Sequence, residues 1–557
     1  MGKRAYIPLA IVGVALVGVI VWRVRQPREP ASTPKPRPTR AQRDFDSLAG
    51  CPSSLYTWTE RGCGFLVYES NADNFDEVLR LAFELHNQGR QREAESLCRV
   101  LMQLRPGDAQ LLFLLGMVLH KLERDPEAVQ WLSRAAELQP NSARVFSGLG
   151  CACQAINEHG RAGESFSRAI ELEGPTNPAC YNLGNSCYNL GDLPRAADLF
   201  RQAAHLNPKD SASWNNLGKT LTELNRLDEA IAAYDHALEA APDYALARYG
   251  RAIALLGAGR LTEGFREYES RWRCREPRQF SIPPWKGQAI PSQTLFVHAE
   301  QGYGDAIQWA RFVPLARARV GRVVLECRPE LKRLFMRSEL ADEVIAHGEP
   351  VPPSDYFLPM ASLPGVLGVT LESIPNQVPY LKVPLAEPLP AAPPGQVKVG
   401  LVWAGNSGHH NDSARSIPIE QFKHLLEIPR VIFYSLQVPV PTGDQPLLRS
   451  LSNVVQLDGR LQDFLCTASA VAQLDLIISV DTAVAHLAGA LARPVWTLVQ
   501  FAADWRWFVE RADTPWYPTM RLFRQSRIGE WNPVIQRVAE ALRDRTAFLH
   551  AQSPKVD

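Results

Sequence analysis

The chain has 557 residues, too many for a single hydrophobic core, and this length predicts about three or four domains. Its 60 lysines and arginines balance 59 aspartates and glutamates, so net charge gives no reason to expect a nucleic-acid partner. Hydrophobic residues make up 46% of the chain, which is ordinary for folded domains and excludes a wholly disordered protein.

The first element in chain order is an uncharged apolar segment, residues 5–22. As a helix it would span about 27 Å, close to the hydrocarbon thickness of a bilayer. A cleaved signal peptide is the alternative, but the segment ends in Trp22 without the small residues of a cleavage site. We therefore expect an uncleaved membrane anchor over residues 1–25.

The distribution of basic residues around the anchor predicts its orientation. Lys3 and Arg4 precede it, and a larger set follows it: Arg23, Arg25, Arg28, Lys35, Arg37, Arg40 and Arg43. The positive-inside rule then predicts a single-pass protein of the inner (cytoplasmic) membrane whose soluble part is cytoplasmic. An inverted anchor with a periplasmic soluble part is the alternative. Residues 26–70 form a spacer rich in proline and arginine, followed by a short N-terminal segment.

A 34-residue repeat follows the spacer. Prolines recur at 106, 140, 208 and 242, and small residues recur in the same frame, namely Gly116, Gly150, Gly184 and Gly218, and Ala94, Ala128, Ala162, Ala196 and Ala230. Small residues at fixed positions allow two antiparallel helices to approach closely. The pattern resembles the tetratricopeptide repeat, with five units from about 75 to 242 and a degenerate sixth that reaches Trp272. We expect a helical solenoid over residues 71–272.

A stack of such repeats presents a concave surface that binds a protein or peptide, although a helical spacer or a homodimer surface is the alternative. Asn182 and Asn216 share one position in adjacent repeats, and their amides could bind a peptide backbone. Leu114 and Gly148 occupy that position in two earlier repeats, so this ladder of amides is short.

The ten cysteines show no disulfide framework. Those in the repeats are interpreted as small apolar packing residues of a reduced compartment: Cys98, Cys151, Cys153, Cys180 and Cys187. Cys51 and Cys63, which flank a short aromatic segment, could form a pair.

Alternation of strands and helices begins after Trp285 and predicts two α/β domains. The first covers residues 280–383 and the second 396–548, joined by a proline-rich link. The fold class is therefore α + α/β: an N-terminal transmembrane helix, a repeat solenoid and a pair of α/β domains. Two such domains form a cleft, and their ligands bind beyond the carboxyl ends of the strands.

Polar residues follow a predicted strand of the second domain, residues 475–480. Asp481 and Thr482 begin a helix there, and His486 lies one turn further on. The free N–H groups of the helix and the Thr482 hydroxyl would donate to a phosphate, whereas Asp481 would fix the turn or accept a ribose hydroxyl. N-capping by Asp481 with a packed His486 is the alternative.

Gly405 and Asn406 follow the first strand of the same domain, and Arg415 precedes the next helix. These residues could bind the diphosphate of a nucleotide from the side opposite Thr482, although Arg415 could equally be a surface arginine. In the first α/β domain, Asp305 lies in the turn after the first strand. A carboxylate there could act as general base for an acceptor hydroxyl, but it equally suits a capped helix start.

Two sequence segments, DTAVAHLAGALARPVW and GYGDAIQWARFVP, resemble the heptosyltransferase-type glycosyltransferases of bacteria, which have the GT-B fold. With the repeats, residues from about 75 to 545 look like bacterial proteins that fuse tetratricopeptide repeats to such a module. The resemblance implies a GT-B-like pair of Rossmann-type domains. It also implies that Asp305 is the general base of an inverting transfer and that Arg415 is the cation for the donor diphosphate. Asp481, Thr482 and His486 match the nucleotide-sugar motif.

Two departures from the family pattern leave the donor sugar open. Ala483 stands where glycine often follows Asp-Thr, and Arg415 stands where lysine is frequent. No Asp-x-Asp motif occurs in residues 280–557, which predicts a transferase that needs neither a metal nor a cofactor, with the nucleotide sugar as co-substrate. Four aromatic residues could stack on a base or sugar or be structural: Trp505, Trp507, Trp516 and Tyr517.

These features favour a membrane-anchored inverting glycosyltransferase whose repeats recruit a protein or envelope acceptor. A scaffold or assembly protein with tetratricopeptide repeats and an inactive transferase-like module is the alternative.

Overall fold

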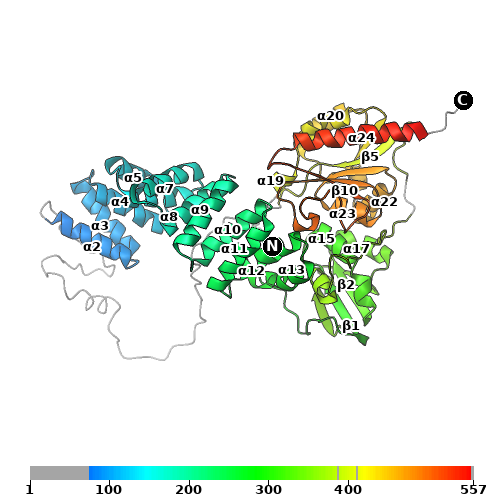
Figure 1. Cartoon of the computed structure of the whole chain (residues 1–557), viewed down its shortest axis with the longest axis horizontal. Helices are drawn as coiled ribbons and strands as arrows, with labels where there is room; N and C mark the ends of the chain where they lie inside the picture. Colours follow the sequence, from blue (N-terminus) through cyan, green and yellow to red (C-terminus); the bar gives the residue numbers. More distant parts are fainter. Residues whose placement is uncertain (1–73, 385–387, 409–411, 553–557) are drawn as a thin grey trace, which may run out of the picture. The chain divides into compact units, whose positions relative to one another are not determined.

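The computed structural model of the protein describes residues 74–384, 388–408 and 412–552. This part of the chain divides into two compact units, the first ending at Pro175 and the second beginning at Thr176 (Figure 1). The predicted anchor at residues 1–25, the spacer at 26–70 and the candidate Cys51–Cys63 pair lie outside the described residues. None of the described helices is long and apolar enough to cross a membrane.

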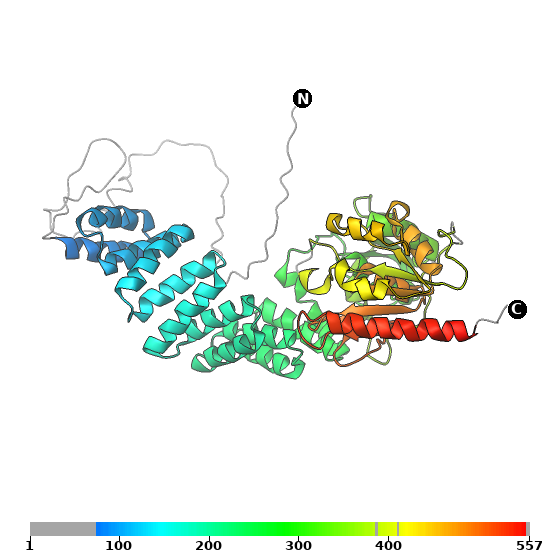
Figure 2. The same cartoon turned by 90° about the horizontal axis from the view of Figure 1, so that it is seen from above.

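The first unit consists of antiparallel helix pairs stacked in rows (Figure 2). The pairs are α2 (Phe75–Asn87) with α3 (Gln91–Leu104), α4 (Ala109–Lys121) with α5 (Asp125–Leu138), and α6 (Ala143–Ala155) with α7 (His159–Glu173). Their helices bury the periodic small residues and leucines of the repeat. The predicted helical repeats are confirmed.

The periodic glycines lie where one helix of a pair crosses a bulky side chain of the other. A methyl group at Gly116 would lie 2.5 Å from Leu132 Cγ, and one at Gly150 would lie 2.7 Å from the Phe166 ring. Glycine at this position therefore sets the close spacing of the two helices.

A second periodic position forms the turn between the two helices of each pair. Its residues have positive φ: Gly89 (79°), Glu123 (60°), Asn157 (62°), Gly191 (82°), Asn225 (58°) and Gly259 (80°). A left-handed residue after a helix lets the chain reverse, and glycine or asparagine adopts it most easily. Glu123 is the member of this series least suited to the conformation.

Replacing Glu123 with glycine is expected to stabilise the first unit by about 0.5–1 kcal/mol. The left-handed conformation costs a non-glycine residue roughly 1–2 kcal/mol, and part of this gain is offset by the greater chain entropy of glycine. Urea unfolding followed by circular dichroism measures the change. Glu84→Gly, within α2, is the control and should destabilise by about 1 kcal/mol. If both variants destabilise equally, the backbone of Glu123 is not the cause.

The second unit continues the repeats. Its helices are α8 (Asn177–Asn189), α9 (Leu193–Leu206), α10 (Ser211–Glu223), α11 (Leu227–Ala240), α12 (Ala245–Gly257), α13 (Leu261–Tyr268) and the short α14 (Arg271–Cys274). The same sterics apply, because a methyl group at Gly218 would lie 2.9 Å from the Tyr234 ring. The repeats thus end at α14, close to the predicted boundary at Trp272.

The first α/β domain contains a parallel sheet in the order β3-β2-β1-β4. Its elements are β1 (Ile290–His298), α15 (Tyr303–Ala310), α16 (Val313–Arg317), β2 (Val320–Cys327), α17 (Pro329–Ser338), β3 (Glu343–Ala346), β4 (Tyr356–Pro359), η2 (Met360–Ser362) and α18 (Leu363–Leu367). One face of the sheet packs on these helices. The opposite face buries Phe296 and Val324 beneath Phe280, which precedes β1.

The second α/β domain contains a parallel sheet of six strands in the order β10-β9-β8-β5-β6-β7. The strands are β5 (Val397–Val402), β6 (Val431–Ser435), β7 (Val454–Gln456), β8 (Leu476–Val480), β9 (Val495–Val499) and β10 (Met520–Arg524). The helices are α19 (Asp412–Arg415), α20 (Lys423–Leu426), α21 (Gln445–Ser450), α22 (Phe464–Ala472), α23 (Ala483–Ala490) and α24 (Asn532–Gln552). Short 3₁₀ turns are η3 (Ile419–Phe422), η4 (Thr442–Asp444), η5 (Asp458–Arg460) and η6 (Trp505–Trp507).

The strand order of this second sheet reverses between β5 and β8, because the chain winds one way through β6 and β7 and the other way through β9 and β10. Helices α20 and α24 cover one face, and α22 and α23 cover the other. The sheet is thus parallel and doubly wound, and ligands of such sheets bind at the carboxyl ends of the two strands where the order reverses.

One continuous core joins the last repeats to both α/β domains. It includes Phe265 of α13, Trp309 of α15 and Trp505 of η6, whose rings pack within about 6 Å of one another. Within the second unit, the repeats from α12 onward and the two sheets are therefore packed together and are not joined only by linkers.

Candidate active site

The first turns of two helices meet where the strand orders reverse. Helix α15 follows β1, at the β1/β4 reversal of the first sheet, and α23 follows β8, at the β5/β8 reversal of the second. A methyl group at Gly304 would lie 2.9 Å from His486 Cδ2 and 3.5 Å from Ala483 Cα, so the two helices touch. The positions where each sheet would bind a ligand therefore lie side by side.

Arg415 lies between the ends of β5 and β8. Its Nη1 donates to the Asp481 carbonyl oxygen at 3.2 Å, and its Nε is 3.3 Å from Asp412 Oδ1. A methyl group at Gly405 would lie 2.6 Å from Nε and Nη2, so a glycine there leaves room for the guanidinium. The Gly405 N–H donates to Ser416 Oγ at 2.9 Å. The structure thus brings Gly405, Arg415 and Asp481 together.

Thr482 differs from its expected orientation. Ser479 Oγ donates to the Val480 carbonyl oxygen at 2.7 Å and lies 3.0 Å from Thr482 Oγ1, so the Thr482 hydroxyl must donate to Ser479. It is turned toward the strand and makes no capping bond. The N–H groups of Ala483 and Val484 have no acceptor within the described chain. They, and not the hydroxyl, are the donors that this helix start offers an anion.

Asn406 lies in the exposed loop after β5. Its Oδ1 accepts from the Gly408 N–H at 3.0 Å. This contact stabilises the turn, and Asn406 lies on the same loop as Gly405.

His486 is enclosed by aromatic rings. Its Nδ1 is 3.0 Å from the Tyr517 hydroxyl, and its ring stacks on Trp507 with centroids 5.1 Å apart. Burial, followed by the charges of Arg506 and Arg311, lowers the pKa of His486 well below its usual range, so the imidazole is neutral. It is a packed histidine whose Nε2 lies 3.9 Å from Asp481 Oδ1. Thr482, not Asp481, holds the N-cap position.

The pKa of the Asp481 carboxyl is raised above its ordinary value. Burial raises its pKa to about 6, and the charge of Asp504 contributes in the same direction. Arg415 and Arg506 lower the pKa but do not cancel these effects. A carboxyl group so perturbed beside a helix start with free N–H groups is typical of a functional site.

If a diphosphate-containing ligand such as a nucleotide sugar binds here, its affinity is expected to depend on this carboxyl. Above about pH 6 Asp481 is ionised and repels a diphosphate; below it the carboxyl is neutral. The dissociation constant should fall about tenfold between about pH 8 and about pH 5, because the diphosphate diester itself does not titrate there. Asp481→Asn should remove this dependence. A wild-type dissociation constant that is unchanged by pH would contradict the assignment.

Asp305 is the third residue of α15 and caps its start. Its Oδ2 accepts from the Gly302 N–H at 2.9 Å, and its Oδ1 pairs with Arg506 Nη2. The side chain remains 26% exposed. The capped helix start is therefore observed, and the partly exposed carboxylate contacts the second α/β domain by its ion pair with Arg506.

Arg506 was not singled out from the sequence, although it lies at the centre of the site. It is nearly buried, with its Cζ 5.1 Å from the Trp309 ring and 4.8 Å from the Trp505 ring, and its Nη1 pairs with Asp504 Oδ1 at 2.8 Å. Burial disfavours its charge, but the carboxylates of Asp504 and Asp305 outweigh this and hold its pKa above the usual range. An arginine between tryptophans after a strand is the sequence signal that could have found it.

The aromatic cluster is structural. Trp507, Trp516 and Tyr517 are fully buried, and Trp505 is 5% exposed. Trp516 Nε1 donates to the Arg506 carbonyl oxygen at 2.9 Å. Of the two alternatives left open by the sequence, burial favours the structural one: these rings form the core beneath the site.

In the candidate amide ladder of the repeats, the Asn216 side chain forms hydrogen bonds within the solenoid. Asn216 Nδ2 donates to the Tyr181 hydroxyl at 3.2 Å and to Asn185 Oδ1 at 3.1 Å. Asn182 is half-buried on α8. These contacts cross-link α8 and α10, and a peptide would have to compete for the Asn216 amide.

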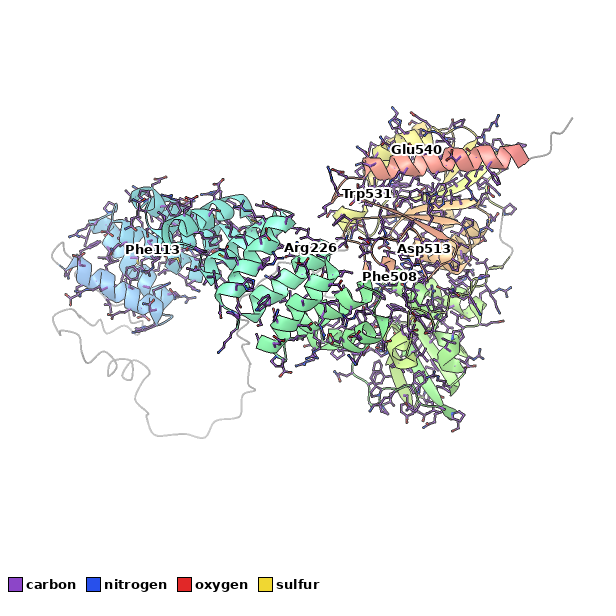
Figure 3. All side chains as sticks on the ribbon, viewed as in Figure 1. Phe113, Arg226, Phe508, Asp513, Trp531 and Glu540 are labelled. Atoms are coloured by element: carbon purple, nitrogen blue, oxygen red, sulfur yellow. The ribbon has the colours of Figure 1, made fainter. Side chains whose placement is uncertain are left out.

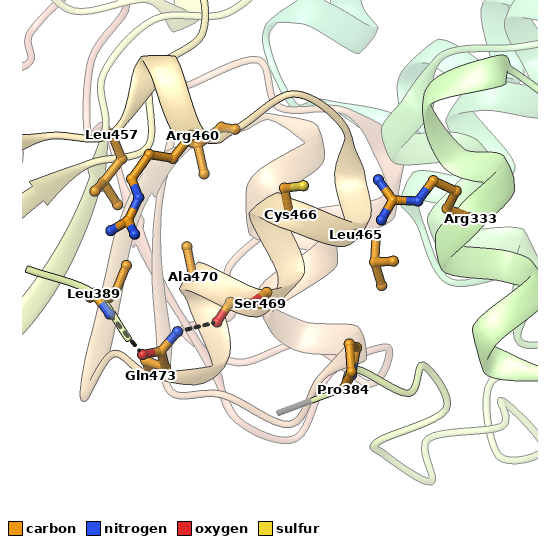
Figure 4. Close-up of a pocket in the computed structure, with 11 residues that line it drawn as sticks. Arg333, Pro384, Leu389, Leu457, Arg460, Leu465, Cys466, Ser469, Ala470 and Gln473 are labelled. Atoms are coloured by element: carbon orange, nitrogen blue, oxygen red, sulfur yellow. Dashed lines mark hydrogen bonds between the residues drawn. The ribbon is translucent and has the colours of Figure 1, made fainter. Parts of the chain in front are cut away.

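A separate pocket of about 220 Å³ lies beside the link between the two α/β domains (Figure 4). Its walls are largely apolar, with Leu457, Leu461 and Leu465 among them, and Arg333 and Arg460 also line it. Pockets for drug-sized ligands are about 300–1,000 Å³, so this one is too small for a nucleotide sugar. None of the predicted site residues lines it. Among the described residues, no cluster of three or more histidine, cysteine or acidic side chains could hold a metal ion.

Comparison with known families identifies the helical part. Residues 85–143, 181–245 and 215–278 match the family model of the tetratricopeptide repeat. The chain contains tetratricopeptide repeats. A curated relative, Protein FlbA of Caulobacter vibrioides, is 29% identical over 343 residues, which cover 55% of this chain and 56% of FlbA. The chain thus spans about half the length of that relative.

Solved repeat proteins are similar to part of the chain. YrrB, a tetratricopeptide repeat protein with an unusual peptide-binding site, is 18% identical with a TM-score of 0.30, covering 32% of this chain and 92% of YrrB. A thermophilic repeat protein of Thermus thermophilus, TTC0263, is 24% identical with a TM-score of 0.27, covering 33% and 99%. MamA of Desulfovibrio magneticus RS-1 is 18% identical with a TM-score of 0.28, covering 31% and 95%.

Proposed function

We propose that the protein is a membrane-anchored, metal-independent, inverting glycosyltransferase that uses a nucleotide-sugar donor and recruits a protein or envelope acceptor through its repeats. The observation that carries the proposal is the meeting of α15 and α23. Gly304, next to Asp305 of one domain, lies against Ala483 of the other, whose helix start has free N–H groups, and Arg415 donates to the Asp481 carbonyl oxygen just before that helix.

The proposed reaction is a direct displacement. Asp305 takes the proton of an acceptor hydroxyl, the hydroxyl oxygen attacks the anomeric carbon, and the bond from that carbon to the diphosphate oxygen breaks. The leaving diphosphate is stabilised by Arg415 and by the N–H groups of Ala483 and Val484. A single displacement inverts the configuration at the anomeric carbon.

In this proposal the repeats bind the acceptor, and the anchor holds the enzyme at the membrane. Repeat arrays bind proteins or peptides, and α12 to α14 pack against the domain that carries Asp305. The anchor at residues 5–22 and the cytoplasmic placement are proposed from the sequence, since nucleotide sugars would be present on the cytoplasmic face.

A scaffold with an inactive transferase-like module is the second candidate. It is favoured by the engagement of both Asp305 oxygens, one with the Gly302 N–H and the other with Arg506. In that case Asp305 only caps α15 and joins the two α/β domains by its ion pair with Arg506.

Calorimetric titration of the full chain separates the two candidates. With EDTA present, one of a panel of UDP-, GDP- and ADP-sugars should bind, and His486→Ala should weaken that binding. The imidazole supports Asp481 and the first turn of α23, so its loss leaves a cavity there. Flat titrations with every nucleotide sugar would favour the scaffold.

A further inference from the structure

The turn at residues 501–508 is held on one side by the repeats. Asn225 Nδ2, at the end of α10, donates to the Phe501 carbonyl oxygen at 2.7 Å. A methyl group at Gly257 of α12 would lie 3.8 Å from Trp505 Cβ, and the Phe265 ring of α13 packs edge-on against Trp505 at 5.8 Å. The turn between α10 and α11, together with helices α12 and α13, thus supports residues 501–508.

On the side away from the repeats, the same turn contacts Asp305, the candidate base. Arg506 pairs with Asp305 of the first α/β domain and with Asp504 of its own turn. The rings of Trp309 and Trp505 enclose the guanidinium. Arg506 Nε is buried and has no hydrogen-bond partner among the described residues. Among the described residues, the guanidinium of Arg506 therefore has hydrogen-bond acceptors only in the carboxylates of Asp305 and Asp504.

The turn carries backbone strain next to Arg506. Phe508, labelled in Figure 3, has a φ of 54°. A left-handed conformation is unfavourable for an aromatic residue and costs about 1–3 kcal/mol, so it persists only where the surrounding contacts impose it. Such strain is typical of segments held in place for function.

The repeats also hold the turn that leads into α15. Gln301 Nε2 donates to the Tyr268 hydroxyl of α13 at 2.7 Å, and the buried Arg271 of α14 places its Nη2 3.1 Å from Glu300 Oε1. The repeats therefore support Asp305 through two sets of contacts. One set involves residues 300–302, and the other involves Arg506.

We propose that Arg506 is a positioning residue for Asp305 and that the α10–α11 turn and helices α12 to α14 hold it in place, so the last repeats are a structural part of the transfer site. The inference rests on the proposed function for its catalytic consequence. Arg506 fixes the rotamer of the Asp305 side chain so that its free lone pairs face the acceptor, and the tryptophan walls keep water from competing for the guanidinium. The repeats then do more than recruit an acceptor.

The first arm of the test replaces Arg506 with lysine. An ammonium keeps the charge but cannot bridge two carboxylates in the planar geometry of arginine, so kcat for nucleotide release should fall about 10–100-fold while donor Kd changes by less than about threefold. Free guanidinium should restore part of the rate to Arg506→Ala. Arg511→Lys is the matched control, because Arg511 forms an exposed pair with Asp513 in the following segment. It should leave kcat unchanged.

The second arm tests the support by the repeats without removing a charge. Asn225→Gly keeps the left-handed turn and deletes only the side chain that reaches Phe501. Asn157→Gly makes the same change at the equivalent turn of the first unit. Hydrogen exchange at the Gly302 amide, which donates to Asp305, reports on the position of the carboxylate. Exchange there should accelerate in Asn225→Gly and in Arg506→Lys, and should be unchanged in Asn157→Gly and Arg511→Lys.

The two readouts separate failure of this inference from failure of the proposed function. If no nucleotide sugar binds the wild-type chain, the proposed function is wrong, and the Gly302 exchange still decides whether Arg506 and Asn225 position Asp305. If donor is turned over but Arg506→Lys and Asn225→Gly match their controls in both kcat and exchange, Arg506 is not a positioning residue. A lower kcat that guanidinium does not restore, with unchanged exchange, also overturns the proposal.

Discussion

Asp305→Asn should lower the rate of nucleotide release from the donor by about 10²–10⁴-fold and leave donor Kd within about twofold. An amide cannot take the proton of the acceptor hydroxyl. The amide oxygen can still accept the Gly302 N–H, so the start of α15 should persist. Turnover and calorimetric Kd, measured on the same preparation, give the two numbers.

A matched carboxylate elsewhere in the same module controls for structural effects. Asp463 caps α22 by accepting the Cys466 N–H at 2.9 Å and pairs with Arg333 of the first α/β domain at 2.8 Å. It therefore repeats both structural roles of Asp305 away from the site. Asp463→Asn should leave turnover unchanged. If Asp305→Asn turns over donor as fast as Asp463→Asn, Asp305 is a cap and not a base.

Arg311→Met should lower the free energy of unfolding of the second unit by about 3–5 kcal/mol. Arg311 of the first α/β domain is buried, and its Nη1 donates to the Trp516 carbonyl oxygen at 2.5 Å and to the Pro375 carbonyl oxygen at 3.2 Å. Its Nη2 donates to the Tyr380 hydroxyl at 3.2 Å. Methionine fills a similar volume but leaves these buried oxygens without donors.

Tryptophan fluorescence during urea unfolding measures this loss, because the Trp516 ring lies 5.6 Å from the guanidinium. Arg317→Met is the control: Arg317 forms an exposed pair with Asp342, whose loss should cost less than about 1 kcal/mol. Equal losses in the two variants would mean that Arg311 does not join the domains. The expected difference would show that the buried Arg311 guanidinium, held by neutral oxygens, stabilises the junction between the two domains.

The repeats could be predicted closely from the sequence because a local steric rule generates their period. A glycine opposite a bulky side chain recurs at a fixed interval, as at Gly116 and Gly150, and each instance depends only on its own helix pair. The positions of Arg415 and Asp481 were also predictable. Asp481 directly follows strand β8 and Arg415 lies in the segment between β5 and β6, and parallel strands bring their carboxyl ends to one edge of a sheet.

The partners within the site could not be predicted in this way. Arg506 and Asp305 are far apart in the sequence, and their ion pair depends on how two domains dock. The orientation of the Thr482 hydroxyl is set by Ser479 on the preceding strand, which no motif records. Burial of Trp507 and Trp516 follows from the core shared with the repeats. The sequence alone therefore could not decide whether these rings stack on a ligand or pack beneath the site.

A crystal structure of the full chain with UDP or GDP tests the central claim most directly. The account predicts that the diphosphate lies between the carboxyl ends of β5 and β8, against Arg415 and the N–H groups of Ala483 and Val484, with Asp305 across from it. A nucleotide bound elsewhere, or no nucleotide at saturating concentration, would contradict it.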